Sequence, residues 1–222
     1  MRVAFLVSGN GGNLKFLHLI NKVVFDSGLD IFVIADRPCG ALKFAQTNNL
    51  ESRLISVKRN DQKNLLEALT LYSPDLIITN IHKILERELV ESMEEKMINL
   101  HYSLLPRYAG TIGTRGVELA TLNRDYLLGV TTHRLDEIVD NGEPIIQSIF
   151  KNPNDLILSS KISFRVGCQH LFTTAQKMLY PSSKIQMVPV ENVLDELIHH
   201  FPPIAPLPPS VNEFFWQKLS NI

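Results

Sequence analysis

The sequence predicts an α/β domain with an open, mostly parallel sheet that is covered by helices on both faces. Short and nearly continuous apolar runs alternate with segments of helical periodicity through the first hundred residues. Such runs are typical of parallel strands that are buried on both faces. After Asn99 the rhythm changes, and two longer strand-like segments flank one acidic loop. This change predicts an antiparallel, hairpin-like extension in the C-terminal half.

The first half contains repeated strand, loop and helix units. Residues 2–7 form a β-rich apolar run, a loop of glycine and asparagine follows, and apolar side chains then recur at helical spacing from Leu14. We expect Asn60 to be the N-cap of a later helix. The further strands are expected at 31–35, 53–57, 75–79 and 95–101, and the further helices at 41–48, between Asn60 and Pro74, and at 85–93.

The second half is expected to form strands at 127–135 and 144–150 and a long amphipathic helix at 160–179. Residues 1–200 are predicted to be one catalytic domain, and residues 201–222 a Pro-rich tail with an extended, polyproline-like stretch. Beyond the prolines, Phe214, Phe215 and Trp216 are interpreted as an anchor onto the domain or as a self-association patch. The adjacent His199 and His200 are expected at the surface.

Composition favours small-molecule partners. The chain has 222 residues, 45% of them hydrophobic and 20% charged, which is enough for a sizeable core. A net charge of −1 gives no electrostatic footprint for nucleic acid or for an anionic membrane. The two cysteines, Cys39 and Cys168, suit a reducing compartment, and no signal segment is evident. We therefore expect a cytoplasmic protein, and the sequence leaves open whether it is a monomer or a homodimer.

An amide, an imidazole and a carboxylate form the candidate catalytic group. Asn99 and His101 are two positions apart on a predicted strand, so their side chains leave the same face. Asp140 follows at the tip of the predicted hairpin. The amide and a protonated imidazole can donate hydrogen bonds to an oxyanion, while Asp140 favours the imidazolium form and relays protons. The alternative is a buried structural histidine beside a loop-capping asparagine.

Two other interpretations of this region carry less weight. Ser103 suggests a Ser/His/Asp triad, but the sequence around it is no nucleophile elbow. A metal site of His101, His133 and Asp140 is possible by residue type, but it has no recognisable spacing, so no metal is predicted.

The first glycine-rich loop is a candidate phosphate site. Gly11, Gly12 and Asn13 follow a strand and begin a helix, where backbone N–H groups and the helix dipole attract an anion. A purely structural turn is one alternative. A dinucleotide site with Asp36 on the ribose is another, but its fingerprint needs glycine where this chain has Leu14.

The motifs resemble those of the folate-dependent formyltransferases, most of all the phosphoribosylglycinamide (GAR) formyltransferases. The stretch 99–106 reads Asn-Leu-His-Tyr-Ser-Leu-Leu-Pro where that family has Asn-Ile-His-Pro-Ser-Leu-Leu-Pro. The stretch 8–14 reads Ser-Gly-Asn-Gly-Gly-Asn-Leu and differs from the family pattern by one small residue. Asp140 takes the place of the acid in a Leu-Asp-Gly-Gly-Pro loop.

The resemblance implies a Rossmann-like fold and a role in one-carbon metabolism, such as purine biosynthesis. It implies 10-formyltetrahydrofolate as co-substrate, and formyl transfer to the primary amine of a small phosphorylated acceptor through a tetrahedral intermediate. It places His133 near the catalytic group. It also implies folate contacts from Lys83, Ile84, Leu85 and Val139.

Departures from the family pattern leave the acceptor open. Thr111–Arg115 lacks the two histidines usual there, and Gly167 and His170 stand where the family places a Gln and a Glu near the acceptor's phosphate and ribose. An amino-sugar nucleotide is therefore an alternative acceptor. A formyltetrahydrofolate hydrolase and a non-catalytic nucleotide- or folate-binding module are the alternative functions.

Overall fold

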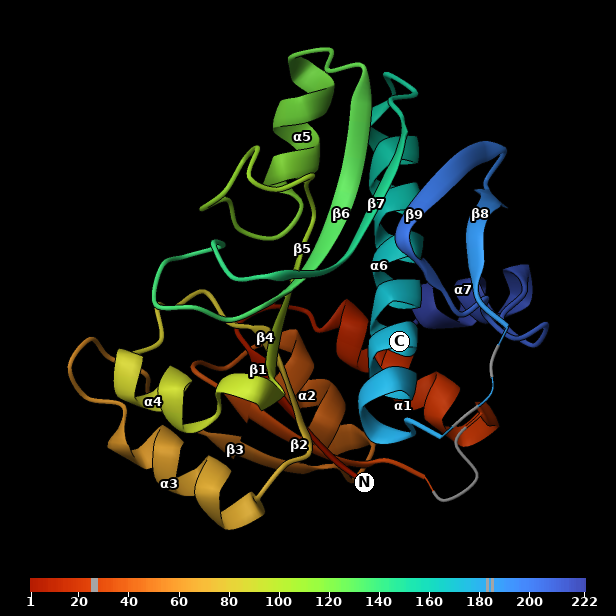
Figure 1. Cartoon of the computed structure of the whole chain (residues 1–222). Coiled ribbons are helices and arrows are strands. Elements are labelled where there is room, and N and C mark those ends of the chain that lie inside the picture. The colour runs from red at the N-terminus through yellow and green to blue at the C-terminus, as the bar shows by residue number, and fades with distance from the viewer. Residues whose placement is uncertain (25–27, 183, 185) are drawn as a thin grey trace. The chain divides into compact units, whose positions relative to one another are not determined.

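The computed structural model describes residues 1–24, 28–182, 184 and 186–222, and the chain divides into two compact units (Figure 1). The first unit comprises Met1–Ile98 and Leu207–Ile222, and the second comprises Asn99–Pro206. The chain passes from the first unit to the second within strand β5 (Met97–His101), after a short 3-10 helix (Glu94–Lys96).

The first unit contains a parallel sheet with the strand order β3-β2-β1-β4. Strand β1, which lies between β2 and β4, is buried from Val3 to Val7, as expected for a strand covered on both faces. Val3 pairs with Ile31 on one side and with Leu76 on the other. The strands are β1 (Arg2–Val7), β2 (Asp30–Ala35), β3 (Glu51–Leu54) and β4 (Leu76–Asn80).

Helices cover both faces of this sheet. In Figure 1, α3 and α4 lie on one side of its strands and α1 and α2 on the other, so the predicted α/β class is confirmed. Asn60 is not the N-cap of α3, because it lies in a turn with φ 65° and the helix begins after Gln62. The helices of the first unit are α1 (Gly12–Val24), α2 (Gly40–Thr47), α3 (Lys63–Tyr72), α4 (Arg87–Ser92) and α7 (Glu213–Ser220).

The second unit is built on antiparallel strands. Their order is β5-β6-β7-β9-β8, and the pairs β6–β7, β7–β9 and β9–β8 are antiparallel, so the predicted hairpin-like extension is confirmed. Helix α6 (Leu156–Leu179) packs against β6 to β9. Its first turn is capped by Asp155, whose carboxylate accepts the Leu158 N–H. The other elements are α5 (Arg115–Leu122), β6 (Leu127–Arg134), β7 (Pro144–Lys151), β8 (Val188–Val193) and β9 (Glu196–Ile204).

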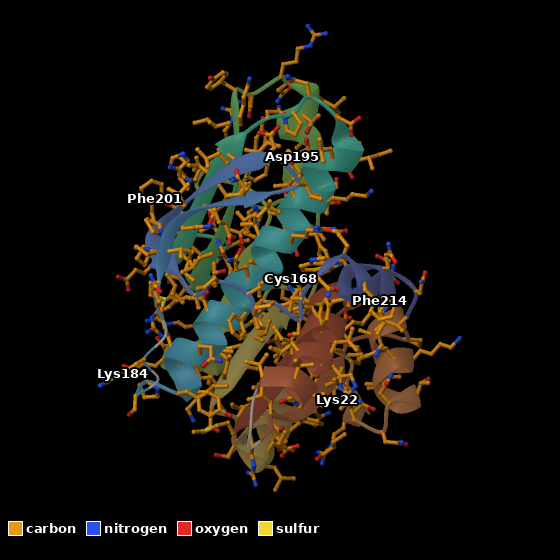
Figure 2. The ribbon with its side chains drawn as sticks, turned by 90° about the vertical axis from the view of Figure 1, so that its right-hand side faces the viewer. Lys22, Cys168, Lys184, Asp195, Phe201 and Phe214 are labelled. Carbon is orange, nitrogen blue, oxygen red and sulfur yellow. The ribbon has the colours of Figure 1, made fainter. Side chains whose placement is uncertain are left out.

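The C-terminal segment differs from the expected polyproline-like stretch at its beginning and at its end. Strand β9 includes Pro202 and Pro203, which are tolerated because the pairing of β9 with β7 ends at Phe201. Asp195 lies at the turn that joins β9 to β8 (Figure 2). No helix in the described part of the chain is long and apolar enough to cross a membrane.

Helix α7 forms most of the predicted aromatic anchor. Phe215 and Trp216 are buried against Phe16 of α1, with ring centroids 5.9 Å apart in both pairs. Phe214 is not part of the anchor, because its side chain is 74% exposed (Figure 2).

Candidate active site

The structure brings Asn99, His101 and Asp140 together within the second unit. Asn99 and His101 extend from β5, and Asp140 lies in the turn between β6 and β7 with φ 56°. Asn99 Nδ2 lies 3.3 Å from Asp140 Oδ1, and His101 Nδ1 lies 3.4 Å from Asp140 Oδ2. The side chains of His101 and Asp140 are only 5% and 8% exposed. The carboxylate therefore contacts both polar groups of β5 in a largely dry environment.

Asp140 is held as a carboxylate. Burial alone would raise the pKa of Asp140, but its contacts with His133 and with the Gly110 N–H outweigh burial and lower it. The Gly110 N–H donates to Asp140 Oδ2 over 2.7 Å, a charge-assisted hydrogen bond. The group is therefore ionised at neutral pH and available to accept a proton.

Both ring nitrogens of His101 have partners. The Nε2–H donates to the carbonyl oxygen of Tyr108 at 3.1 Å, with Thr111 Oγ1 at 3.4 Å, and Nδ1 faces Asp140. Burial lowers the pKa of His101 more than Asp140 and the Tyr108 carbonyl raise it. The expectation that Asp140 would favour the imidazolium is thus correct for that pair alone, whereas desolvation decides the net direction.

His133 completes the cluster from β6. It is 2% exposed, and its Nε2 lies 3.3 Å from Asn99 Nδ2 and 3.6 Å from Asp140 Oδ1. Its Nδ1 lies 2.7 Å from the carbonyl oxygen of Arg134. Two imidazoles thus flank one carboxylate.

The structure assigns Ser103 a structural task. Its hydroxyl donates to the carbonyl oxygen of Arg107 over 2.6 Å, so it is not aimed at His101. Among the described residues, no group of three or more His, Cys, Asp or Glu is arranged to hold a metal ion.

The role of the segment that carries Tyr108 and Gly110 was not predicted from the sequence. The segment acts through backbone atoms, which leave no side-chain signature in a motif. The only signal was Gly110, whose φ of 78° marks a turn that favours glycine. Hydrogen bonds to one carboxylate hold the segment in place, because the Tyr108 hydroxyl and the Arg107 guanidinium both donate to Asp125.

In the glycine-rich loop of the first unit, the backbone at Gly11 packs closely against α2, as the glycines of the sequence indicate. Gly11 has φ 71°, and a Cβ there would lie 2.6 Å from the Ala41 Cβ. Helix α1 begins at Gly12. The Asn13 side chain is buried and donates to Asn80 Oδ1 at 3.4 Å, so the backbone N–H groups of the first turn are the natural donors for an anion.

Asp36, the acid of the dinucleotide alternative, is engaged by its neighbours. Its side chain is 1% exposed and accepts from Arg37 Nη2 at 2.7 Å. Hydrogen bonds from Arg37 and Ser8 outweigh burial and lower the pKa of Asp36. Leu14 is fully buried where the dinucleotide fingerprint has glycine.

The residues expected to contact folate lie in both units. In the first unit, Lys83 and Ile84 are exposed and Leu85 is buried. Gln62 fixes this segment by donating to the Ile84 carbonyl and accepting from the Glu86 N–H. In the second unit, Val139 is 48% exposed beside Asp140.

The first unit has the parallel strands of an α/β fold. The second unit has a cluster of an amide, an imidazole and a carboxylate that is suited to acyl transfer. The chain belongs to the formyl transferase family, since residues 1–152 match the family described as "Formyl transferase".

Relatives of two kinds are similar to this chain. Methionyl-tRNA formyltransferase of Campylobacter lari is 30% identical over 144 residues, which cover 59% of this chain and 46% of that protein. Phosphoribosylglycinamide formyltransferase of Escherichia coli K12 is 26% identical over 158 residues, covering 67% of this chain and 72% of that protein. The match spans about half of the length of the first relatives.

A solved structure shows the same fold. Phosphoribosylglycinamide formyltransferase from Streptococcus pneumoniae TIGR4 has a TM-score of 0.66 and 24% identity, covering 81% of this chain and 98% of that one. The mostly parallel α/β fold expected from the sequence is thus supported independently.

Proposed function

We propose that this chain transfers a formyl group from 10-formyltetrahydrofolate to the primary amine of a small phosphorylated acceptor. The observation that carries the proposal is the convergence of Asn99, His101 and Asp140, in which one carboxylate contacts both an amide and an imidazole. A binding module would need no such cluster, whereas acyl transfer needs oxyanion donors and a proton acceptor in one place.

The residues match the demands of the reaction. The amine nitrogen bonds to the formyl carbon, the bond from that carbon to the folate nitrogen breaks, and one proton passes from the amine to the departing nitrogen. Asp140 accepts that proton, directly or through water, because its low pKa keeps it ionised. Asn99 and His101 donate N–H groups to the oxyanion. For this, the Nε2–H of His101 leaves the carbonyl oxygen of Tyr108 and donates to the oxyanion instead.

The formyl donor is a co-substrate, and the loop beside Asp140 suits it. Ile138 and Val139 are 64% and 48% exposed, and they offer apolar surface next to the carboxylate. Apolar walls with a few fixed polar groups are typical of sites for flat heterocycles. We propose Val139 as a folate contact on this loop. Lys83, Ile84 and Leu85 of the first unit are proposed as folate contacts on the family resemblance.

The acceptor is proposed to be a GAR-like phosphorylated amine, with its phosphate at Gly11, Gly12 and Asn13. The two positions of α6 where the family places phosphate and ribose contacts carry different residues here. A Cβ on Gly167 would lie 2.9 Å from the Tyr102 ring, and His170 is fully buried with Ser148 and Thr132. An amino-sugar nucleotide therefore remains the alternative small acceptor.

A second candidate acceptor is methionyl-tRNA, because 30% identity to methionyl-tRNA formyltransferase extends over 144 residues. The net charge of −1 argues against it, since tRNA recognition relies on basic surface.

Cys39 and Cys168 are both free thiols, which supports the proposed cytoplasmic setting.

One assay separates these functions. Consumption of 10-formyltetrahydrofolate is followed with no acceptor, with GAR, with an amino-sugar nucleotide and with methionyl-tRNA. Turnover that depends on a small phosphorylated amine supports the proposal. Release of formate without any amine identifies a hydrolase, turnover with methionyl-tRNA alone identifies the second acceptor, and silence in every arm rejects an enzyme of this class.

A further inference from the structure

The tautomer of His133 is fixed by the backbone. Its Nδ1 lies 2.7 Å from the Arg134 carbonyl oxygen, and a carbonyl only accepts, so Nδ1 carries the hydrogen. Nε2 faces two groups, Asn99 Nδ2 at 3.3 Å and Asp140 Oδ1 at 3.6 Å. The nearer of them is an N–H donor, so in the neutral ring the lone pair of Nε2 accepts from Asn99. The carbonyl is itself closely packed, because a Cβ on Gly142 would collide with it.

This tautomer fixes the orientation of the Asn99 amide. The His133 Nε2 lone pair needs a donor, and Asn99 Nδ2 lies 3.3 Å away. The same nitrogen lies 3.3 Å from Asp140 Oδ1, which also only accepts while it is ionised. One hydrogen of the amide therefore points to His133 and the other to the carboxylate.

We infer that His133 is a positioning residue, which holds the first Asn99 N–H so that the second is aimed at the reacting carbon. This inference rests on the proposed function. In this structure the second N–H lies on Asp140 Oδ1. When Asp140 takes up the amine proton, it becomes a weaker acceptor, and this N–H passes to the oxyanion. Without His133, the amide is held only by its N–H on Asp140, and once that N–H leaves the carboxylate the amide can turn its oxygen toward the reacting carbon.

The tautomer is tested directly in the wild-type protein. Long-range ¹H–¹⁵N spectra of the imidazole rings are expected to show that the neutral His133 ring carries its hydrogen on Nδ1 and none on Nε2. A ring protonated at Nε2 would overturn the inference, because it could not accept from Asn99. The measurement needs no turnover, so it stays informative if the proposed reaction fails.

A matched pair of variants tests the role. His133→Gln carries an oxygen that reaches the place of Nε2 and can accept from Asn99, whereas His133→Asn is too short and keeps only the contact with Arg134. We expect His133→Asn to lower kcat at least tenfold, as partial loss of an oxyanion donor does. KM for both substrates should change less than threefold, and His133→Gln should recover most of the lost kcat.

Coupling to Asn99 separates positioning from a structural role. In an Asn99→Ala background, His133→Asn should cost less than threefold, because no amide is left to orient. An equal loss in both backgrounds, or a folded His133→Asn protein with normal kcat, would refute the inference. If His133→Asn does not fold, Gly142→Ala tests the same carbonyl, and a shifted His133 Nδ1 signal without a fall in kcat would refute it too.

Failure of the proposed function has a different signature. If the spectra show the Nδ1–H tautomer but the wild-type protein transfers no formyl group, the reaction assignment fails while the hydrogen-bond assignment stands.

Discussion

Nδ1 of His101 lies 3.4 Å from Oδ2 of Asp140, while Nε2 of the same ring lies 3.1 Å from the carbonyl oxygen of Tyr108. The imidazole is therefore held between a carboxylate and a backbone acceptor. The carbonyl fixes which nitrogen carries a permanent hydrogen, so the proton that titrates is the one on Nδ1, facing Asp140.

This relationship predicts that catalysis depends on the carboxylate of Asp140. Asp140→Asn should lower kcat at least about a hundredfold, because the amide cannot take up the amine proton. Folding should be retained, since the new side-chain oxygen can still accept from Gly110. Steady-state assays and thermal denaturation measure the two effects.

A control for Asp140→Asn lies in the same loop. Asp136 is exposed, and in the described part of the chain its carboxylate accepts only from the loop itself, from the Glu137 N–H and from Asn141 Nδ2. Asp136→Asn should leave kcat within twofold of the wild-type value. Normal turnover in Asp140→Asn, or an equal loss in both variants, would contradict the assigned role.

The glycine-rich loop predicts a second pair of variants. Gly11→Ala should destabilise the protein by about 1–3 kcal/mol, because φ is 71° and the new Cβ would lie 2.6 Å from the Ala41 Cβ. Gly9→Ala should change stability by less than about 0.5 kcal/mol, since nothing lies within 4 Å of its Cβ. Urea denaturation of both variants checks the difference, and equal stabilities would remove the steric argument.

The sequence predicts well those elements that local pattern determines. Apolar runs predicted β1, β2 and β4 to within one or two residues, because buried parallel strands need little else. The position of β3 was less accurate: it was expected at 53–57 and lies at Glu51–Leu54. Its residues are mostly exposed at the edge of the sheet, so they carry no apolar signal.

Tertiary contacts explain the elements that the pattern missed. His200 was expected at the surface, but it is 2% exposed and lies 2.6 Å from Ser148 Oγ through Nδ1. Adjacent residues of a strand point to opposite faces, so His199 and His200 cannot both face solvent, and His200 lies on the inner face of β9. That strand was not predicted, because Pro202 and Pro203 indicated an extended tail instead.

The candidate site divides in the same way. The side chains of Asn99, His101 and Asp140 could be selected from spacing and motif. The contacts of Tyr108 and Gly110 could not, because backbone atoms leave no trace in residue type.

The aromatic anchor of α7 predicts an asymmetric response. Phe215→Ala should lower stability by about 3 kcal/mol, because the ring is buried against Phe16 and Trp216. Phe214→Ala should change it by less than about 0.5 kcal/mol, since that side chain is 74% exposed. Thermal unfolding measures both, and a comparable loss in Phe214→Ala would show that the anchor is wrongly assigned.

The buried His170 makes stability depend on pH. Burial, and to a lesser extent the charge of His200, lowers the pKa of His170 from 6.5 to about 3. Its ring nitrogens contact Thr132 Oγ1 at 3.1 Å and Ser148 Oγ at 2.6 Å. As pH falls below 6.5, the unfolded chain binds a proton that the native protein does not bind until about pH 3.

The free energy of unfolding should therefore fall by up to about 1.4 kcal/mol per pH unit from this one group between pH 6.5 and 3. The lowered pKa values of His18 and His101 act in the same direction. Replacing His170 with Gln removes one titrating group, so urea denaturation between pH 7 and 4 should give a shallower slope whatever the absolute stability of the variant. Identical slopes for the two proteins would mean that His170 is protonated in the native state as readily as in the unfolded chain, and the buried network would then have to admit charge.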